Sequence, residues 1–187
     1  MSEAVTALAG KSYSGLVDLA DAGLTGMITL RGDLGSTKLA AAVKEATGAT
    51  VPGVRRIETG ATGRAAWMSP DELLLIVDYK QVGSVVTWLE GALDGEFATA
   101  ADVSDARAMV TIKGPLAMDM LAKVCPVDFA DFAVGEVRRT RAAQVAAALW
   151  RDDENDWSLV CFRSVGIYVW DMLATVSKPG GEVGLYR

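Results

Sequence analysis

The sequence predicts an α+β fold made of two tandem units, each with the element order β-α-β-β-α-β. The first observation is a repeat, because the strand-like stretch MITLRGDL at 27–34 recurs as MVTIKGPL at 109–116, about 82 positions later. The second is that a helical pattern, two further apolar runs and another helical pattern follow each copy. A repeat that divides a chain into halves of one plan predicts two similar units, each with helices covering a sheet.

The first half begins with a predicted strand at 26–31 and a glycine turn. Ser36 is suited to cap the N-terminus of a helix over 37–47, and Gly48 is suited to end it. The helical spacing places three apolar side chains on one face: Leu39, Val43 and Ala46.

Residues 54–68 are predicted to be extended, with a bulge or bend at Gly60 and Gly63. Residues 69–72 carry a strong helix-start signal, yet the continuous apolar run at 73–77 is typical of a buried strand. We therefore predict that 69–72 form one helical turn inside a hairpin connection.

The next helix-start signal is clearer. Asp78 can cap a helix with Gln81 three residues later, and apolar residues at helical spacing continue over 79–93. Gly95 marks the end of this helix. Residues 96–105 then form a candidate extended bridge to the second half.

The second half is predicted to repeat the plan, with a strand at 108–113 and a helix at 116–124 that Pro126 stops. The stretch GEVRR at 135–139 echoes GVRR at 53–56.

Residues 142–149 favour a helix by propensity, but the repeat predicts a strand, and we follow the repeat. An acidic turn at 152–156 is the counterpart of 69–72. A strand at 157–162 and a helix capped by Ser164 come next.

The repeat sets the expected domain organisation. Residues 26–95 form the first unit and 103–187 the second, and together they make a single compact domain over 1–187. Residues 1–25, rich in Ala, Gly and Asp, are expected to be an irregular N-terminal lead-in with at most a short helical turn. Residues 182–186 are predicted to be a last strand.

Composition narrows the class of protein. The net charge of −6 and pI near 4.7 argue against nucleic acid and against an anionic membrane surface as partners. No apolar run is long enough for a membrane span, and no signal peptide is evident. Two distant cysteines, Cys125 and Cys161, are consistent with a reducing cytoplasm, where we expect the protein to be.

The apolar content suggests surface that needs a partner. Counting Gly and leaving out Tyr, apolar residues make up roughly 59% of the chain, against a usual 45–50%. The five tryptophans could contribute to such an interface, although we expect at least half of them in the core: Trp67, Trp88, Trp150, Trp157 and Trp170.

The chain contains no histidine. This excludes Ser-His and Cys-His nucleophile pairs, histidine-ligated metal and flavin attachment through histidine. No CxxC motif, phosphate loop or dinucleotide fingerprint is present. We expect neither a catalytic residue nor a metal site.

Five separated motifs, in order, resemble the gamma subunit of heterotetrameric sarcosine oxidase. They are GMITLRGDL (26–34), WMSPDELL (67–74), VSDARA (103–108), LAKVCPVD (121–128) and RS (163–164) with YVW (168–170). That family resembles the folate-binding domain of the glycine-cleavage aminomethyltransferase, which is built from paired ferredoxin-like units. The resemblance therefore implies two ferredoxin-like units packed as a pseudo-dimer.

The resemblance also implies a function. The family's complex converts sarcosine, tetrahydrofolate and O2 to glycine, 5,10-methylenetetrahydrofolate and H2O2. FAD, FMN, NAD, tetrahydrofolate and zinc belong to other subunits, and no cofactor is expected on this chain. The implied partners are the alpha, beta and delta subunits, and the implied role is non-catalytic and structural.

A second hypothesis is a small-molecule module that retains a folate-type site. Guanidinium groups suit the carboxylates of a folate glutamate tail, and a carboxylate could face a pterin ring. The candidates are Arg55, Arg56, Arg138, Arg139 and Asp105. A third hypothesis, an independent enzyme that uses Asp33, Asp71 or Asp105 as acid or base, carries less weight, because acids in turns usually cap or face solvent.

Overall fold

The computed structural model describes residues 3–186 and divides the chain into two compact units. The central unit is Leu24–Ser104. The terminal unit combines, among the described residues, 3–23 with 105–186. Each unit has one antiparallel sheet covered by helices, which confirms the α+β prediction.

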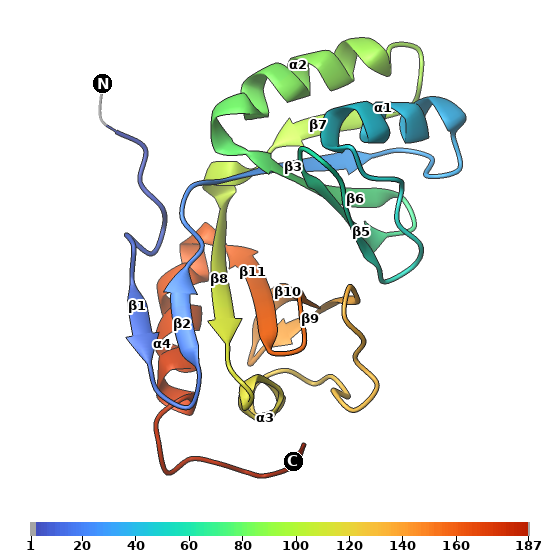
Figure 1. The fold of residues 1–187 in the computed structure, drawn as a ribbon. Coiled ribbons are helices and arrows are strands. Elements are labelled where there is room, and N and C mark those ends of the chain that lie inside the picture. The colour runs from blue at the N-terminus through green and yellow to red at the C-terminus, as the bar shows by residue number, and fades with distance from the viewer. Residues whose placement is uncertain (1–2, 187) are drawn as a thin grey trace. The chain divides into compact units, whose positions relative to one another are not determined.

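The central unit is a five-stranded sheet in the order β4-β5-β6-β3-β7 with two helices (Figure 1). Its elements are β3 (Thr25–Arg31), α1 (Thr37–Thr47), β4 (Ile57–Thr59), β5 (Arg64–Ser69), β6 (Glu72–Asp78), the 3-10 turn η1 (Tyr79–Gln81), α2 (Val82–Ala92) and β7 (Thr99–Asp102).

Local signals account for most of this unit. The Ser36 hydroxyl accepts a hydrogen bond from the Leu39 N–H at 3.3 Å, and Gly48 ends α1 with a left-handed φ of 72°. The apolar run of β6 is buried on both faces of the sheet, as expected for so continuous a run. Asp78 caps η1 through the Lys80 N–H, whereas Gln81 makes no side-chain cap.

The terminal unit is a six-stranded sheet in the order β1-β2-β8-β11-β10-β9. Its elements are β1 (Ser12–Ser14), β2 (Asp18–Asp21), β8 (Arg107–Lys113), α3 (Ala117–Ala122), β9 (Val137–Ala142), β10 (Val145–Arg151), β11 (Asp156–Phe162), η3 (Arg163–Val165) and α4 (Gly166–Val176). A further 3-10 turn, η2 (Ser104–Ala106), lies where the chain enters this unit.

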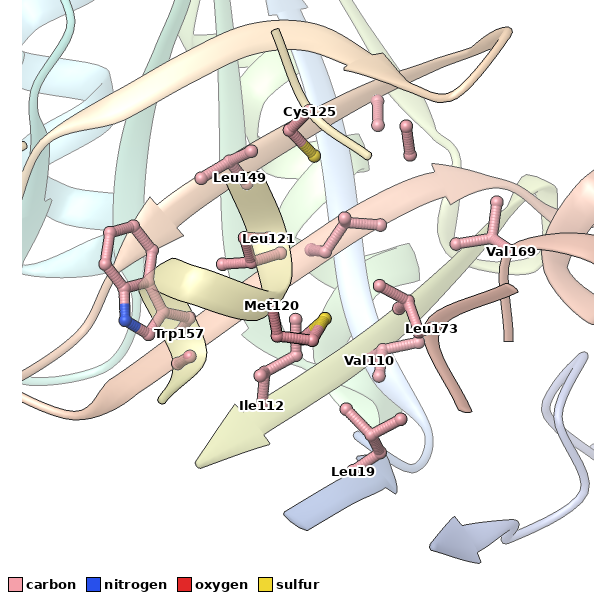
Figure 2. Packing of buried hydrophobic residues seen from close by; sticks show 14 of the residues in the cluster. Leu19, Val110, Ile112, Met120, Leu121, Cys125, Leu149, Trp157, Val169 and Leu173 are labelled. Atoms are coloured by element: carbon pink, nitrogen blue, oxygen red, sulfur yellow. The ribbon is translucent and has the colours of Figure 1, made fainter. Parts of the chain in front are cut away.

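The core of the terminal unit lies between its sheet and the helices α3 and α4 (Figure 2). Met120 and Leu121 reach it from α3, and Val169 and Leu173 reach it from α4. Trp157 packs against both Phe129 and Phe132, with ring centroids 5.5 and 4.8 Å apart. All three are among the largest fully buried side chains of the described chain.

The sequence repeat corresponds to a structural repeat. Arg31 faces Glu72 across β3 and β6, with an ion pair of 2.7 Å, and Lys113 faces Asp156 across β8 and β11, with one of 2.8 Å. An ion pair between a basic and an acidic residue therefore lies at the same end of β3 and of β8.

The two units also share their edge register. Asp102 of β7 lies opposite Ile28, and Asp21 of β2 lies opposite Val110, at the equivalent position. The next residues bond alike, since Val103 N–H donates to Met27 O at 2.9 Å and Ala22 N–H donates to Met109 O at 3.0 Å. β2 of the terminal unit and β7 of the central unit therefore occupy equivalent positions, each beside the repeated strand of its own sheet.

This equivalence corrects two predictions. Residues 1–25 are not an irregular lead-in, because β1 and β2 are strands of the terminal sheet. Residues 182–186 are not a strand, because β2 already fills the position beside β8. This tail is instead held by the buried carboxylate of Asp119, which accepts from Gly184 N–H at 2.9 Å and Tyr186 N–H at 2.8 Å.

The helical turn predicted at 69–72 is also wrong. Ser69 and Glu72 are cross-strand partners, so Pro70 and Asp71 form a two-residue hairpin loop. The Ser69 hydroxyl bonds to the Asp71 carboxylate at 2.5 Å instead of capping a helix. The burial of β6 outweighs the local helix-start signal.

The choice of strand over helix for 142–149 is confirmed, since β9 and β10 meet there around a turn at Ala143 and Gln144. The helix predicted at 116–124 is shorter than expected, at Ala117–Ala122. The helix predicted after Ser164 begins instead as η3 and has no side-chain cap. A single compact domain with units at 26–95 and 103–187 stays a prediction.

Candidate functional site

A shallow hollow of about 750 Å³ lies at one end of the central sheet. It brings together Asp33 and Asp71, two of the acids considered for an enzyme, with Glu96 and Phe97. Asp33 accepts a hydrogen bond from the Gly35 N–H, and Asp71 pairs with Arg31 and the Ser69 hydroxyl. Both acids therefore stabilise turns, which is a more common role for acidic residues in turns than acid–base catalysis.

A second hollow of about 340 Å³ lies beside β7 and α2. Its lining combines apolar residues with three acids: Leu89, Leu93, Ala98 and Ala100, with Glu90, Asp94 and Glu96. Leu89 and Leu93 are themselves almost wholly buried. The chain segment 96–99 contributes to both hollows. Phe97 of this segment lines the 750 Å³ hollow, and its side chain is fully exposed. The sequence predicts only an extended bridge at 96–105. The sequence signal for this hollow is an aromatic residue, Phe97, between a helix end and a strand.

Among the folate-site candidates, Arg55 and Arg56 lie in a turn before β4. Arg55 has a left-handed φ of 61°, and the Arg56 N–H donates to Gly53 O at 3.0 Å. The equivalent turn in the terminal unit has Gly135 with φ 73° and Glu136, whose N–H donates to Ala133 O at 3.0 Å. The structural counterpart of Arg55 is therefore Gly135.

This comparison corrects the sequence echo between 53–56 and 135–139, which is out of register by two positions at its glycines and by three at its arginines. Arg138 and Arg139 lie on β9 rather than in a turn, and they point to opposite faces of the sheet. The guanidinium of Arg138 pairs with the Glu136 carboxylate and lies over the Phe132 ring at 5.2 Å. The two arginine pairs do not occupy equivalent places.

Asp105, the remaining candidate, is exposed in η2 just before β8. Strands β11 and β10 separate β8 from β9, and neighbouring strands are about 4.8 Å apart, so β8 and β9 are about 14 Å apart. The terminal unit therefore does not bring Asp105 together with Arg138 and Arg139.

The two cysteine thiols are buried in the terminal core and unpaired. Burial raises the pKa of Cys125 to about 12 and the pKa of Cys161 to about 11, and for Cys161 the nearby Arg107 opposes part of that rise. Neither thiol is ionised near neutral pH, so neither is an activated nucleophile. Within residues 3–186, no group of three or more Cys, Asp and Glu side chains is placed to hold a metal ion.

We expect both thiols of the folded chain to react only slowly with a chromogenic disulfide reagent at pH 8, and to react rapidly after unfolding in urea. Because the folded pKa values are raised, the unfolded chain loses its thiol protons first; stability is therefore full below the ordinary thiol pKa near 8.5 and falls as pH rises toward 11 to 12. Urea titrations at pH 7 and pH 10 measure this loss. Rapid modification of either thiol in the folded chain would contradict the burial.

The tryptophans divide as expected between core and surface. Trp150, Trp157 and Trp170 are buried, which confirms core packing for three of the five. Trp88 on α2 is 42% exposed, and Trp67 is partly buried. Within residues 3–186 no helix is long and apolar enough to cross a membrane.

Comparisons with known proteins agree with this architecture. Residues 31–178 match the family described as "Sarcosine oxidase, gamma subunit family". The sarcosine oxidase subunit gamma of Corynebacterium sp. (strain U-96) is 32% identical over 148 residues, covering 77% of this chain and 71% of the relative. The subunit gamma of Arthrobacter sp. is 32% identical over 158 residues, covering 81% and 75%.

Two solved structures share the fold. A chain of heterotetrameric sarcosine oxidase from Corynebacterium sp. U-96, in complex with pyrrole 2-carboxylate, superposes with a TM-score of 0.81 and 27% identity, covering 93% of this chain and 91% of that chain. The glycine cleavage system aminomethyltransferase T from Bartonella henselae has a TM-score of 0.61 at 12% identity, covering 82% and 44%. The second likeness concerns the fold alone.

Proposed function

The chain belongs to the sarcosine oxidase gamma subunit family, and from this we propose that it is a non-catalytic, structural subunit of a heterotetrameric sarcosine oxidase. The observation that carries the proposal is the match to a chain of such a heterotetramer over 91% of that chain's length. Because a shared fold does not by itself imply a shared function, the reconstitution described below tests this proposal.

Side-chain chemistry supports a role without catalysis. The chain has no histidine, and its two thiols are buried and protonated near neutral pH. Asp33 and Asp71, which come together in the 750 Å³ hollow, serve a turn and an ion pair. These features favour an activity that resides in partner subunits.

The proposed partners are the alpha, beta and delta subunits, which would carry FAD, FMN, NAD, tetrahydrofolate and zinc. The assembled enzyme would convert sarcosine, tetrahydrofolate and O2 to glycine, 5,10-methylenetetrahydrofolate and H2O2. We place this assembly in the cytoplasm, a proposal supported by the two unpaired, buried cysteines.

The folate-type module is the alternative proposal. Arg138 would have to exchange its Glu136 partner and its contact with Phe132 for a folate carboxylate, which costs part of the energy gained. Titration calorimetry of tetrahydrofolate into the isolated chain separates the two proposals. Saturable heat would support the folate module, and no heat at millimolar ligand would end it.

Reconstitution tests the structural role. We expect the other sarcosine oxidase subunits of the same organism, co-expressed with this chain carrying an affinity tag, to co-purify with it in one complex that oxidises sarcosine. The same subunits without this chain should give less complex and less H2O2 per flavin, and this chain alone should give none. A full-size, fully active complex that forms without this chain would contradict the proposal.

A further inference from the structure

Strand β7 stands at the end of the central sheet. Among residues 3–186 it pairs with β3 and has no strand on its outer side. Val103 N–H bonds to Met27 O across this pair, and backbone groups alternate in direction along an antiparallel strand. Ala100 and Asp102 therefore direct their N–H and C=O groups outward, away from β3.

The terminal unit shows how the equivalent edge is used. β2 corresponds to β7 in register, and its outer edge is paired with β1. Tyr13 of β1 lies opposite Leu19, and Asp21 N–H donates to Lys11 O at 2.8 Å. Leu19 and Asp21 are the counterparts of Ala100 and Asp102. The same fold thus receives an antiparallel segment at one edge and leaves the other edge open.

A hollow lies beside the outer edge of β7, at the position that corresponds to Tyr13 of β1 in the terminal unit. Tyr13 packs against the core of the terminal unit from its position opposite Leu19. The position opposite Ala100 in the central unit adjoins the 340 Å³ hollow, whose lining includes Leu89 and Leu93. A large side chain with an apolar body on an added strand would lie in this hollow, as Tyr13 packs against the core of the terminal unit.

The acidic residues around the 340 Å³ hollow indicate the charge of a segment that could bind at the β7 edge. Glu90, Asp94 and Glu96 line this hollow, and no Lys or Arg of residues 3–186 does. The Lys38 ammonium lies nearby and donates to the Asp94 carbonyl oxygen at 2.5 Å. Glu90 lies at the C-terminal end of α2 and Asp94 just beyond it, where the helix dipole disfavours negative charge. Helix stability therefore does not account for Glu90 and Asp94, and Lys or Arg side chains of a partner segment would complement their charge. Phe97, fully exposed beside the edge, adds an apolar contact.

We propose that the outer edge of β7 receives an antiparallel extended segment of another subunit, with a large apolar residue flanked by Lys or Arg. The inference rests on the proposed function, because the partner is a subunit of the same complex. A second copy of this chain is disfavoured, since pairing two β7 edges would bring two sets of acids together. The mode is strand addition, in which main-chain hydrogen bonds supply affinity.

Two variants of this chain, whose association with the partner subunits is measured, test the inference. Ala100→Pro removes an outward N–H, so it blocks strand addition while the hydrogen bonds to β3 remain. Glu96→Lys reverses one charge at the rim of the hollow. Glu45→Lys, on the exposed face of α1 in the same unit, is the matched control. Thermal melting of each isolated chain checks that it folds.

We expect Ala100→Pro to weaken association with the partner subunits by about tenfold or more, and Glu96→Lys by about threefold to tenfold. Glu45→Lys should bind as the unmodified chain does, and added salt should weaken association of the unmodified chain. Normal assembly of both Ala100→Pro and Glu96→Lys would overturn the inference.

Hydrogen exchange of the unmodified chain gives an independent readout. In the free chain the amides of Ala100 and Asp102 should exchange fast and that of Ala101 slowly; in the complex all three should be slow. If the complex forms while the amides of Ala100 and Asp102 still exchange fast, the proposed function remains supported, but the docking of a segment at the β7 edge is refuted. Failure of the unmodified chain to enter any complex refutes the proposed function instead, and protection that depends on chain concentration identifies a second copy as the occupant.

Discussion

Replacing Leu19 by aspartate is expected to lower the free energy of unfolding by about 4 kcal/mol or more, because it buries a carboxylate in a cluster of apolar side chains. Leu19 is 1% exposed in β2, and it lies between Tyr13 of β1 and Ile112 of β8. Whole domains are stabilised by only about 5–15 kcal/mol. A loss of this size removes a large share of the stability, so the variant should unfold at a markedly lower urea concentration.

The matched control is Val5→Asp, the same chemical change in the same N-terminal segment. Val5 is 63% exposed, so its replacement should shift stability by less than about 0.5 kcal/mol. Urea unfolding at pH 7, followed by far-UV circular dichroism, measures both. Equal and small effects would mean that residues 1–25 are the irregular lead-in their composition predicts, and that β2 is not part of the terminal core.

Replacing Trp157 by alanine is expected to cost about 3–5 kcal/mol, since truncation leaves a cavity that the packed rings around it cannot fill. Trp157 is 1% exposed, and it makes edge contacts with Phe129 and Phe132. Arg151 also lies over its ring, 5.5 Å from the centroid. The loss should appear as a lower urea midpoint with an unchanged slope.

Two further variants separate volume from polarity. The Trp157 indole N–H is buried and has no hydrogen-bond partner among the described residues, so its removal relieves a desolvation cost. Trp157→Phe keeps a ring and should cost clearly less than Trp157→Ala. Trp88→Ala, at the exposed position on α2, should cost less than about 1 kcal/mol. If Trp157→Ala is as mild as Trp88→Ala, the aromatic group does not hold the core together.

Local signals predicted the long elements well. The helix at 37–47 carries its own cap, its own apolar face and its own stop at Gly48, and the structure has α1 at these bounds. The apolar run at 157–162 became β11, because a continuous apolar run is most stable when buried on both faces. For 142–149, the repeat outweighed helix propensity, which is worth only tenths of a kcal/mol per residue.

The candidate site was harder to predict. Sequence spacing grouped Arg55 and Arg56 with Arg138 and Arg139, but backbone conformation places Gly135 where Arg55 lies. Asp33 and Asp71 are far apart in sequence, and the pairing of β3 with β6 brings them to one hollow. Strand register decides such neighbours, and register depends on partners that are remote along the chain.

The sequence by itself determined the repeat, the α+β class, the absence of histidine chemistry and the resemblance to the gamma subunit family. Only the tertiary structure decided which strands complete each unit. β2 comes from the Ala/Gly/Asp-rich N-terminal segment, whose weak periodicity gives little local preference, and it is a strand because β8 and β1 supply hydrogen bonds and burial for it. Long-range pairing of this kind has no local signature, since its stabilising contacts lie about ninety residues away in the chain.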